Sequence, residues 1–115
     1  MTTGLEPCVV AYPIQEWVAF EERLAKLPQF DESVAMLRRI YVSGAVDCEV
    51  DKLGRVLVPS SLREHASLKR DLIWAGMGTH IELWDKGRYE GQRDAVLADP
   101  DKRHAMARRL AELGL

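Results

Sequence analysis

The spacing of apolar residues separates helical from extended segments in the first part of the chain. A short apolar run over 8–12 predicts a strand. Apolar positions recur on a helical period over 14–27, and this predicts a helix that Pro28 ends. Asp31 suits the N-cap of a second helix that reaches about Val42. This part of the chain therefore predicts one strand followed by two helices.

The period changes after residue 44. Apolar and acidic residues alternate over 45–50, which predicts a strand with one face in water. A turn over 51–54, in which Gly54 can take a positive φ, leads into a returning strand over 55–58. Together these segments predict a β-hairpin.

A short helix and two more strands are predicted next. Ser61 and Glu64 have the spacing of a capping box at the start of a helix. The apolar runs over 72–77 and 80–84 predict strands joined across Gly78. The pattern thus returns to extended structure after the short helix.

Two helices are predicted to close the chain. Asp85 would cap a helix over about 86–98, and Asp99 would open the last one. The last helix carries apolar residues on one side, namely Ala105, Met106, Leu110 and Leu113. That side suits packing or a contact between subunits.

Two stretches of the chain resemble each other. Residues 9–28 can be laid over residues 81–100 at an offset of 72, and in both a strand ends in an aromatic residue and a helix follows. At this offset the hairpin near residue 46 has its counterpart before Met1. We therefore expect an incomplete first copy, either because the chain starts late or because another subunit supplies the strands. The alternative is two unrelated strand-to-helix junctions.

Composition narrows the class of protein. A content of 47% hydrophobic and 30% charged residues is ordinary for a soluble globular protein. No apolar run approaches the roughly 20 residues that cross a bilayer, and no signal peptide is visible, so a cytoplasmic location is expected.

Cys8 and Cys48 are expected to be buried, as are the aromatic side chains Trp17, Trp74, Trp84 and Tyr89. No catalytic constellation and no metal-ligand spacing is present, so we expect no enzyme, cofactor, metal or small-molecule substrate.

Charge is distributed unevenly along the chain. The formal net charge is only −2, yet residues 52–70 contain five basic residues and one acidic residue. Nucleic acid responds to the local field, so contacts with phosphate are expected in this segment. The basic candidates are Lys52, Arg55, Arg63, Lys69 and Arg70.

The segment over 50–59, with Asp51 and Arg55 four residues apart, resembles the DxxxR strand-turn-strand motif of the MraZ family. The strand over 81–85 resembles the end of a second repeat in that family, and the resemblance covers about residues 5–98. It implies an α+β fold, namely an AbrB-like swapped-hairpin β-barrel with flanking helices and two tandem repeats, the first incomplete. The implied division is residues 1–44 for the remnant of the first repeat, 45–98 for the second repeat and 99–115 for a C-terminal helix.

The resemblance also implies a function. Members of the family are DNA-binding transcriptional regulators that bind repeated promoter boxes of the division and cell-wall gene cluster as closed rings, which places them in the cytoplasm at the nucleoid. The related fold also occurs in antitoxins, so a protein-interaction module is the alternative. No disordered partner-binding tail is predicted here, because the C-terminal residues have an amphipathic helical pattern.

Arg55 is the first candidate for contact with DNA, because a guanidinium can bind phosphate or the edge of guanine. The alternative is that Arg55 only pairs with Asp51 and steadies the turn. Asp51 is a candidate for orienting Arg55, since phosphate repels a carboxylate. Lys52 lies at the tip of the turn and is a candidate phosphate contact.

Overall fold

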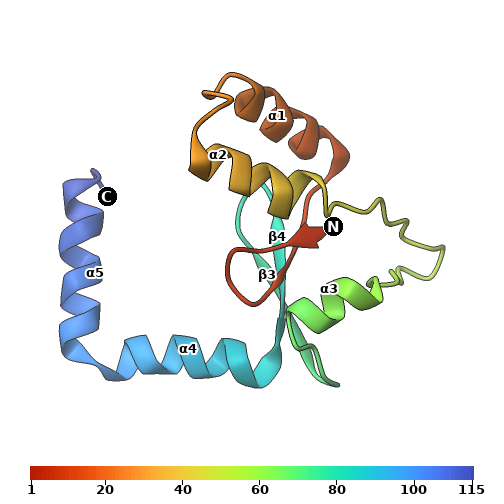
Figure 1. Cartoon of the computed structure of the whole chain (residues 1–115). Helices are drawn as coiled ribbons and strands as arrows, with labels where there is room; N and C mark the ends of the chain where they lie inside the picture. Colours follow the sequence, from red (N-terminus) through yellow and green to blue (C-terminus); the bar gives the residue numbers. More distant parts are fainter. The chain divides into compact units, whose positions relative to one another are not determined.

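The computed structural model describes all 115 residues, which form an α+β protein of two compact units, Met1–Asp85 and Lys86–Leu115. The second unit consists of α4 (Lys86–Ala98) and α5 (Pro100–Glu112). The first unit contains β1 (Thr2–Thr3), β2 (Val9–Ala11), α1 (Ile14–Ala25), α2 (Glu32–Leu37), the π-helical turn η1 (Arg38–Val42), α3 (Ser60–His65), β3 (Leu72–Gly76) and β4 (Ile81–Asp85) (Figure 1). The strands predicted near residues 8–12, 72–77 and 80–84 and the helices near 14–27 and 86–98 are confirmed.

The four strands form one open antiparallel sheet in the order β1-β2-β4-β3. The implied closed barrel is therefore not formed by this chain. The two central strands are far apart in sequence, and Val10 of β2 lies opposite Glu82 of β4 at the middle of their ladder. β1 and β3 pair on the outer edges of β2 and β4. The sheet thus consists of two hairpins joined side by side.

The register of the central ladder matches the repeat offset. The ladder contains the pairs Val9–Leu83 and Ala11–Ile81. At the offset of 72, Val9 corresponds to Ile81 and Ala11 corresponds to Leu83. The two pairs are therefore counterparts of each other. The offset also exchanges the two members of the central pair. A pseudo-two-fold axis perpendicular to the sheet therefore relates β2 to β4, in agreement with the predicted offset. The outer strands depart from it by one residue, because Thr2 lies opposite Val10 whereas Trp74 lies opposite Leu83.

The core forms where α3 crosses one face of the sheet. Val9 and Leu83 are opposite each other on that face, and both are fully buried by Leu62 and Ala66 of α3. Leu62 and Ala66 are four residues apart, so they share one side of the helix. Burial of a leucine side chain stabilises a fold by about 1.5–3 kcal/mol, so α3 and the central ladder stabilise each other.

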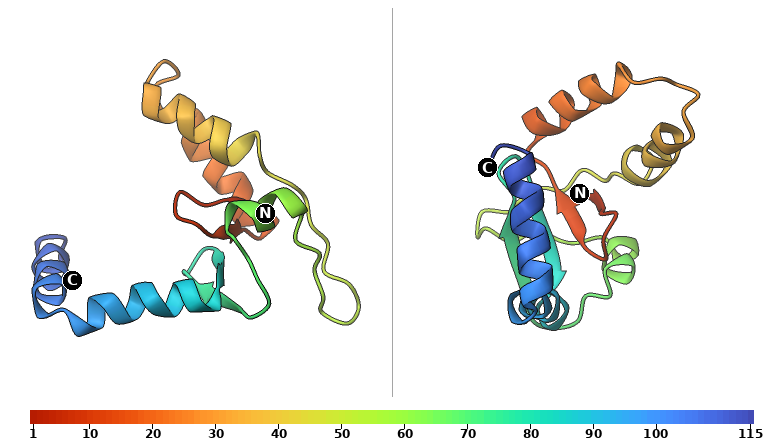
Figure 2. Two further views of the ribbon diagram at one scale, coloured as in Figure 1. Left: turned by 60° about the horizontal axis from the view of Figure 1, so that its bottom comes forward. Right: turned by 90° about the vertical axis from the view of Figure 1, so that its left-hand side faces the viewer.

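The predicted hairpin over 45–58 is wrong as a pair of strands. A single bridge joins Val50 to Val56, and the rest of the segment is a long open loop (Figures 1 and 2). Val50 is 67% exposed and Leu57 is 81% exposed, so apolar side chains that alternate correctly for a strand lie in solvent. An isolated two-stranded ribbon is marginal in water unless its apolar face is packed. The exposure of Val50 and Leu57 shows that these apolar side chains are not packed in the first unit.

The predicted N-caps can be compared with the observed first residues of the helices. The carboxylate of Asp31 accepts hydrogen bonds from the backbone N–H groups of Ser33 and Val34, as its predicted role as N-cap requires. Asp99 caps α5 in the same way. The capping box predicted at Ser61 is wrong, because α3 starts one residue earlier after Pro59 and has no side-chain cap. Ser61 consequently lies inside the first turn.

Three smaller predictions are also corrected. The second helix is α-helical only to Leu37 and then widens into η1. Cys48 is only partly buried, because it lies on the open loop, whereas Cys8 is buried as expected. Trp74 is 49% exposed, because it lies on the edge strand β3, outside the part of the same face that Leu62 and Ala66 of α3 cover. Trp84 is buried as predicted.

A glycine at position 67 is expected to stabilise the first unit. Ser67 follows α3 with φ of 50°, where its backbone N–H donates to the carbonyl of Glu64. A residue with a Cβ loses roughly 1–2 kcal/mol of stability in the left-handed region, and glycine avoids this strain. Glycine also loses more conformational entropy on folding, which offsets part of the stabilisation. Ser67→Gly should raise the free energy of unfolding by about 0.5–1 kcal/mol in urea denaturation.

The matched control is Ser33→Gly in the first turn of α2. There glycine relieves no strain and should lower the free energy of unfolding by about 0.5–1 kcal/mol. Equal effects of the two substitutions would contradict the proposed strain at Ser67.

Candidate nucleic-acid interface

The turn over residues 51–55 is fixed by one carboxylate. Oδ1 of Asp51 accepts hydrogen bonds from the backbone N–H groups of Leu53 at 2.9 Å and Arg55 at 2.8 Å. The backbone closes the same turn, since the N–H of Asp51 donates to the carbonyl of Arg55 at 2.8 Å. Gly54 takes the predicted positive φ, 79°, and its N–H donates to the carbonyl of Asp51. The turn is therefore specified locally, although the flanking strands are not formed.

The same carboxylate holds the side chain of Arg55. Nε of Arg55 donates to Oδ2 of Asp51 at 2.9 Å. The arginine side chain is nevertheless 74% exposed, and its two terminal nitrogens make no hydrogen bond within the chain. The structure therefore shows the pairing of Arg55 with Asp51 across the turn, while the donors at the end of Arg55 face solvent. Contact of Arg55 with DNA stays a prediction.

These contacts have an electrostatic consequence. Hydrogen bonds from the backbone N–H of Arg55, from its side chain and from the backbone N–H of Leu53 hold the pKa of Asp51 below its ordinary value of 3.8. Asp51 is therefore ionised at neutral pH and keeps its role as acceptor.

The remaining candidates lie near in sequence but are not joined to the turn. Lys52 is exposed within the turn itself. Arg63 is exposed on α3, and Lys69 and Arg70 are exposed in the segment that follows it. No hydrogen bond or ion pair connects these four residues with Asp51 or Arg55. The structure thus brings together only the acid and the arginine of the motif.

His65 was not identified from the sequence as a residue that positions α3, the helix that carries Arg63. Nε2 of His65, at the end of α3, lies 3.1 Å from the carbonyl oxygen of Gly4 and 3.3 Å from that of Glu6, so it donates to the loop between β1 and β2. The partners are about sixty positions apart, and no local signal reveals such a contact. His65 helps to position the helix that carries Arg63.

Other kinds of chemistry find no support in the side-chain geometry. No group of three or more histidine, cysteine or acidic side chains is placed to hold a metal ion. Burial raises the pKa of the Cys8 thiol to about 12, so it stays protonated and is a poor nucleophile. None of the helices has the length and apolar character needed to span a membrane.

The α+β fold with its open antiparallel sheet and the exposed Asp51–Arg55 turn are consistent with the class of MraZ-like proteins. Comparison with known proteins agrees with that class. Residues 41–112 match the model of a family described as the MraZ protein and as antitoxin-like. The matched range includes α5, which lies beyond the residues that carried the resemblance in the sequence. The chain belongs to the MraZ family.

Curated relatives named transcriptional regulator MraZ share about 40% identity with the chain. The protein from Caldanaerobacter subterraneus subsp. tengcongensis is 43% identical over 78% of this chain and 63% of its own length. That from Lachnoclostridium phytofermentans is 40% identical over 100% of this chain and 77% of its own length. That from Heliobacterium modesticaldum is 44% identical over 76% of this chain and 62% of its own length. The family is one of transcriptional regulators, not of enzymes.

Acid is expected to release the turn. Because folding lowers the pKa of Asp51, its stabilising effect is complete above about 3.8 and is lost as the pH falls through the lower folded value. NMR titration should show the Asp51 carboxyl carbon and the Arg55 Nε–H changing together with a midpoint below 3.8. In Asp51→Asn the Arg55 signal should stay in its acid-end position at neutral pH. A midpoint at or above 3.8 would exclude the hydrogen-bonded carboxylate.

Proposed function

We propose that the chain is a sequence-specific DNA-binding transcriptional regulator that acts as a homo-oligomer, with Arg55 as its leading DNA contact. The observation that carries this proposal is the state of Arg55. Its Nε is held by Asp51, while the terminal nitrogens are unpaired in solvent at an exposed turn. The name transcriptional regulator, carried by relatives that share about 40% identity, supports the same function.

The proposed contact follows from the geometry of the guanidinium. With Nε bound to Oδ2 of Asp51, the guanidinium group is tethered to the turn, and its terminal N–H groups have no partner within the chain. Those donors can bind two acceptors at once, either phosphate oxygens or O6 and N7 of guanine. Fixing the side chain before binding reduces the entropy that is lost on contact.

The other basic candidates would position the protein on DNA. Lys52, Arg63, Lys69 and Arg70 are exposed and can reach phosphates without reading sequence. Asp51 would orient Arg55 and make no contact of its own. Binding would accordingly weaken as salt increases.

Self-association is the second part of the proposal. Only eight apolar residues are buried, whereas nineteen large hydrophobic side chains are exposed. A monomer rarely leaves so much apolar surface in water, so subunit contacts are expected to cover part of it. A ring presenting several turns to repeated promoter boxes, such as those of a division and cell-wall gene cluster, would bind more tightly through effective concentration.

A protein-binding role is the second candidate function. The family description includes the term antitoxin-like, and the apolar side of α5 is exposed, with Met106 at 51% and Leu113 at 64%. Under this alternative, Leu113→Asp would abolish binding of a partner protein while DNA binding by the free chain stayed unchanged.

Removal of Arg55 is expected to weaken specific DNA binding. Arg55→Ala should lower affinity for DNA from upstream of the division and cell-wall cluster about ten- to a hundredfold, because a bidentate contact contributes about 1–3 kcal/mol. Fluorescence anisotropy at two salt concentrations measures the effect. The matched control is Arg109→Ala, since Arg109 is also exposed and paired with an acid, Glu112. Equal losses in both variants, or none in Arg55→Ala, would contradict the proposed contact.

Removal of Lys52 is expected to act differently. A phosphate contact carries no sequence information, so Lys52→Ala should weaken specific and nonspecific DNA alike. It should also reduce the slope of log affinity against log salt concentration by about 1. A loss confined to the specific DNA would instead assign base contact to Lys52.

A further inference from the structure

A pocket with a volume of about 460 Å³ lies between α1 and η1 in the first unit. Its lining has an apolar part and a charged part, formed by Leu24, Ala25 and Val42 and by Glu21, Arg38 and Arg39. Sites for small molecules in proteins have volumes of roughly 300–1,000 Å³ and combine apolar walls with a few polar or charged groups. The pocket therefore has the size and the lining of a small-molecule site.

The guanidinium group of Arg38 is only partly paired in this pocket. Nη2 of Arg38 donates to the carbonyl oxygen of Leu24 at 3.2 Å, which uses one of the five N–H donors of the group. Nε of Arg38 is buried and has no hydrogen-bond partner. Nη1 makes no hydrogen bond within the chain either, but it is not buried. A partly buried cation that lacks an acceptor costs free energy, so Arg38 favours a negatively charged acceptor at its open side.

The acidic residue of the pocket does not supply that acceptor. Glu21 forms no ion pair with Arg38 or Arg39, although all three line the pocket. Glu21 and Arg39 are exposed, so water solvates both of them. Two arginines and one glutamate leave the pocket with a net positive charge. The local field therefore favours an anion as ligand.

The π-helical turn holds the arginine wall of the pocket in place. The N–H of Ser43 donates to the carbonyl of Arg38, five residues earlier, at 3.0 Å. Oγ1 of Thr2, in β1, donates to the carbonyl of Tyr41 at 2.7 Å and ties η1 to the sheet. Single π-helical turns occur frequently at functional sites. A wall that is fixed before binding reduces the entropy lost when a ligand enters.

We propose that the pocket between α1 and η1 binds a small organic carboxylate. The carboxylate accepts hydrogen bonds from the open side of Arg38 and lies in the field of Arg39. The apolar body of the ligand packs against Leu24 and Val42. A singly charged carboxylate suits the pocket better than a doubly charged phosphate, because Glu21 repels the second charge.

Benzoate and benzamide test the proposal on the full chain, because they share a shape and differ in charge. In the isotopically labelled protein, benzoate should shift the NMR signals of the Leu24 and Val42 methyl groups and of the Arg38 guanidinium until they saturate. Benzamide should bind at least about tenfold more weakly, because it brings no charge to the guanidinium. Inorganic phosphate should also bind more weakly than benzoate, because it has no apolar body to bury.

Three variants and one control locate the contact. Arg38→Gln should lower the affinity for benzoate at least about tenfold, and Arg39→Gln, at an exposed position, only about twofold. Glu21→Gln should raise the affinity, because it removes a like charge from the pocket. Arg109→Gln, on α5 in the second unit, should leave it unchanged. Arg39→Gln and Glu21→Gln change exposed side chains, so they test the site even where Arg38→Gln does not fold.

Four results would overturn the proposal. Unchanged signals at millimolar benzoate would mean that the pocket binds no such molecule, and equal binding of benzamide would mean that charge is not recognised. Weaker binding to Glu21→Gln would make the acid a ligand contact, which a simple carboxylate cannot provide. Tighter binding of N-acetylglutamate amide than of benzoate would assign the pocket to an acidic side chain of a partner protein. None of these results depends on DNA binding, because the pocket shares no residue with the Asp51–Arg55 turn.

Discussion

The antiparallel pairing of β2 with β4 is the constraint on which the first unit depends. These strands come from opposite ends of the unit, and their ladder brings Val9 beside Leu83. Without it the β1–β2 and β3–β4 hairpins would be separate ribbons, each marginal in water. With it a shared apolar face exists for α3 to cover, and Leu62 gains a buried position. The core is therefore a product of a contact between distant segments.

The Asp51–Arg55 turn is stabilised in a different way. Its carboxylate accepts hydrogen bonds from two backbone N–H groups and one side chain, all within four residues. The turn therefore does not need the sheet, and it keeps its geometry on a loop whose apolar side chains are exposed. Local definition of the turn allows an exposed arginine to be oriented on an otherwise open segment. The candidate site and the core thus rest on separate interactions.

This difference explains how much the sequence could predict. The turn, the caps at Asp31 and Asp99 and the main helices depend on local signals, and these predictions are confirmed. The prediction of strands over 45–58 was wrong, although the apolar and polar residues alternate as in a strand. A two-stranded ladder also needs packing on its apolar face, and the alternation of residues does not show whether that packing exists. The order of the sheet and the bond of His65 to Gly4 join distant residues, so only the folded structure reveals them.

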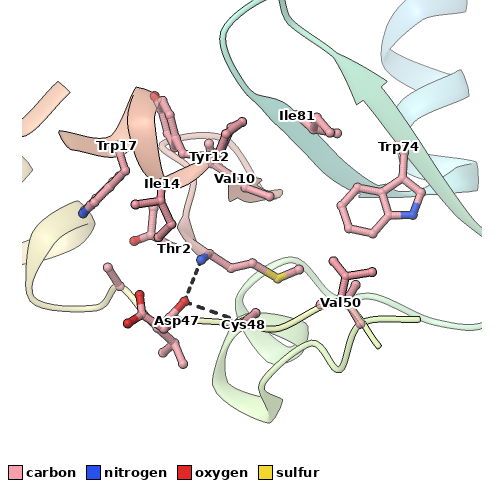
Figure 3. A pocket seen from close by; sticks show the side chains of 16 residues that line it. Thr2, Val10, Tyr12, Ile14, Trp17, Asp47, Cys48, Val50, Trp74 and Ile81 are labelled. Carbon is pink, nitrogen blue, oxygen red and sulfur yellow. Dashed lines mark hydrogen bonds between the residues drawn. The ribbon is translucent and has the colours of Figure 1, made fainter. Parts of the chain in front are cut away.

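An apolar groove on the sheet and the DNA-contact candidate share one segment, and this links their behaviour. The groove has a volume of about 420 Å³ and lies between Trp74 of β3 and the open loop (Figure 3). Val50 and Val56 line the groove, and they flank the turn that holds Asp51 and Arg55. Any apolar side chains that packed against these valines would cover apolar surface that the loop leaves in water. Covering that surface would favour the strands over 45–58, because packing is what an isolated ribbon lacks. Arg55 would then project from a stiffer hairpin, and the entropy lost in the proposed contact with DNA would be smaller.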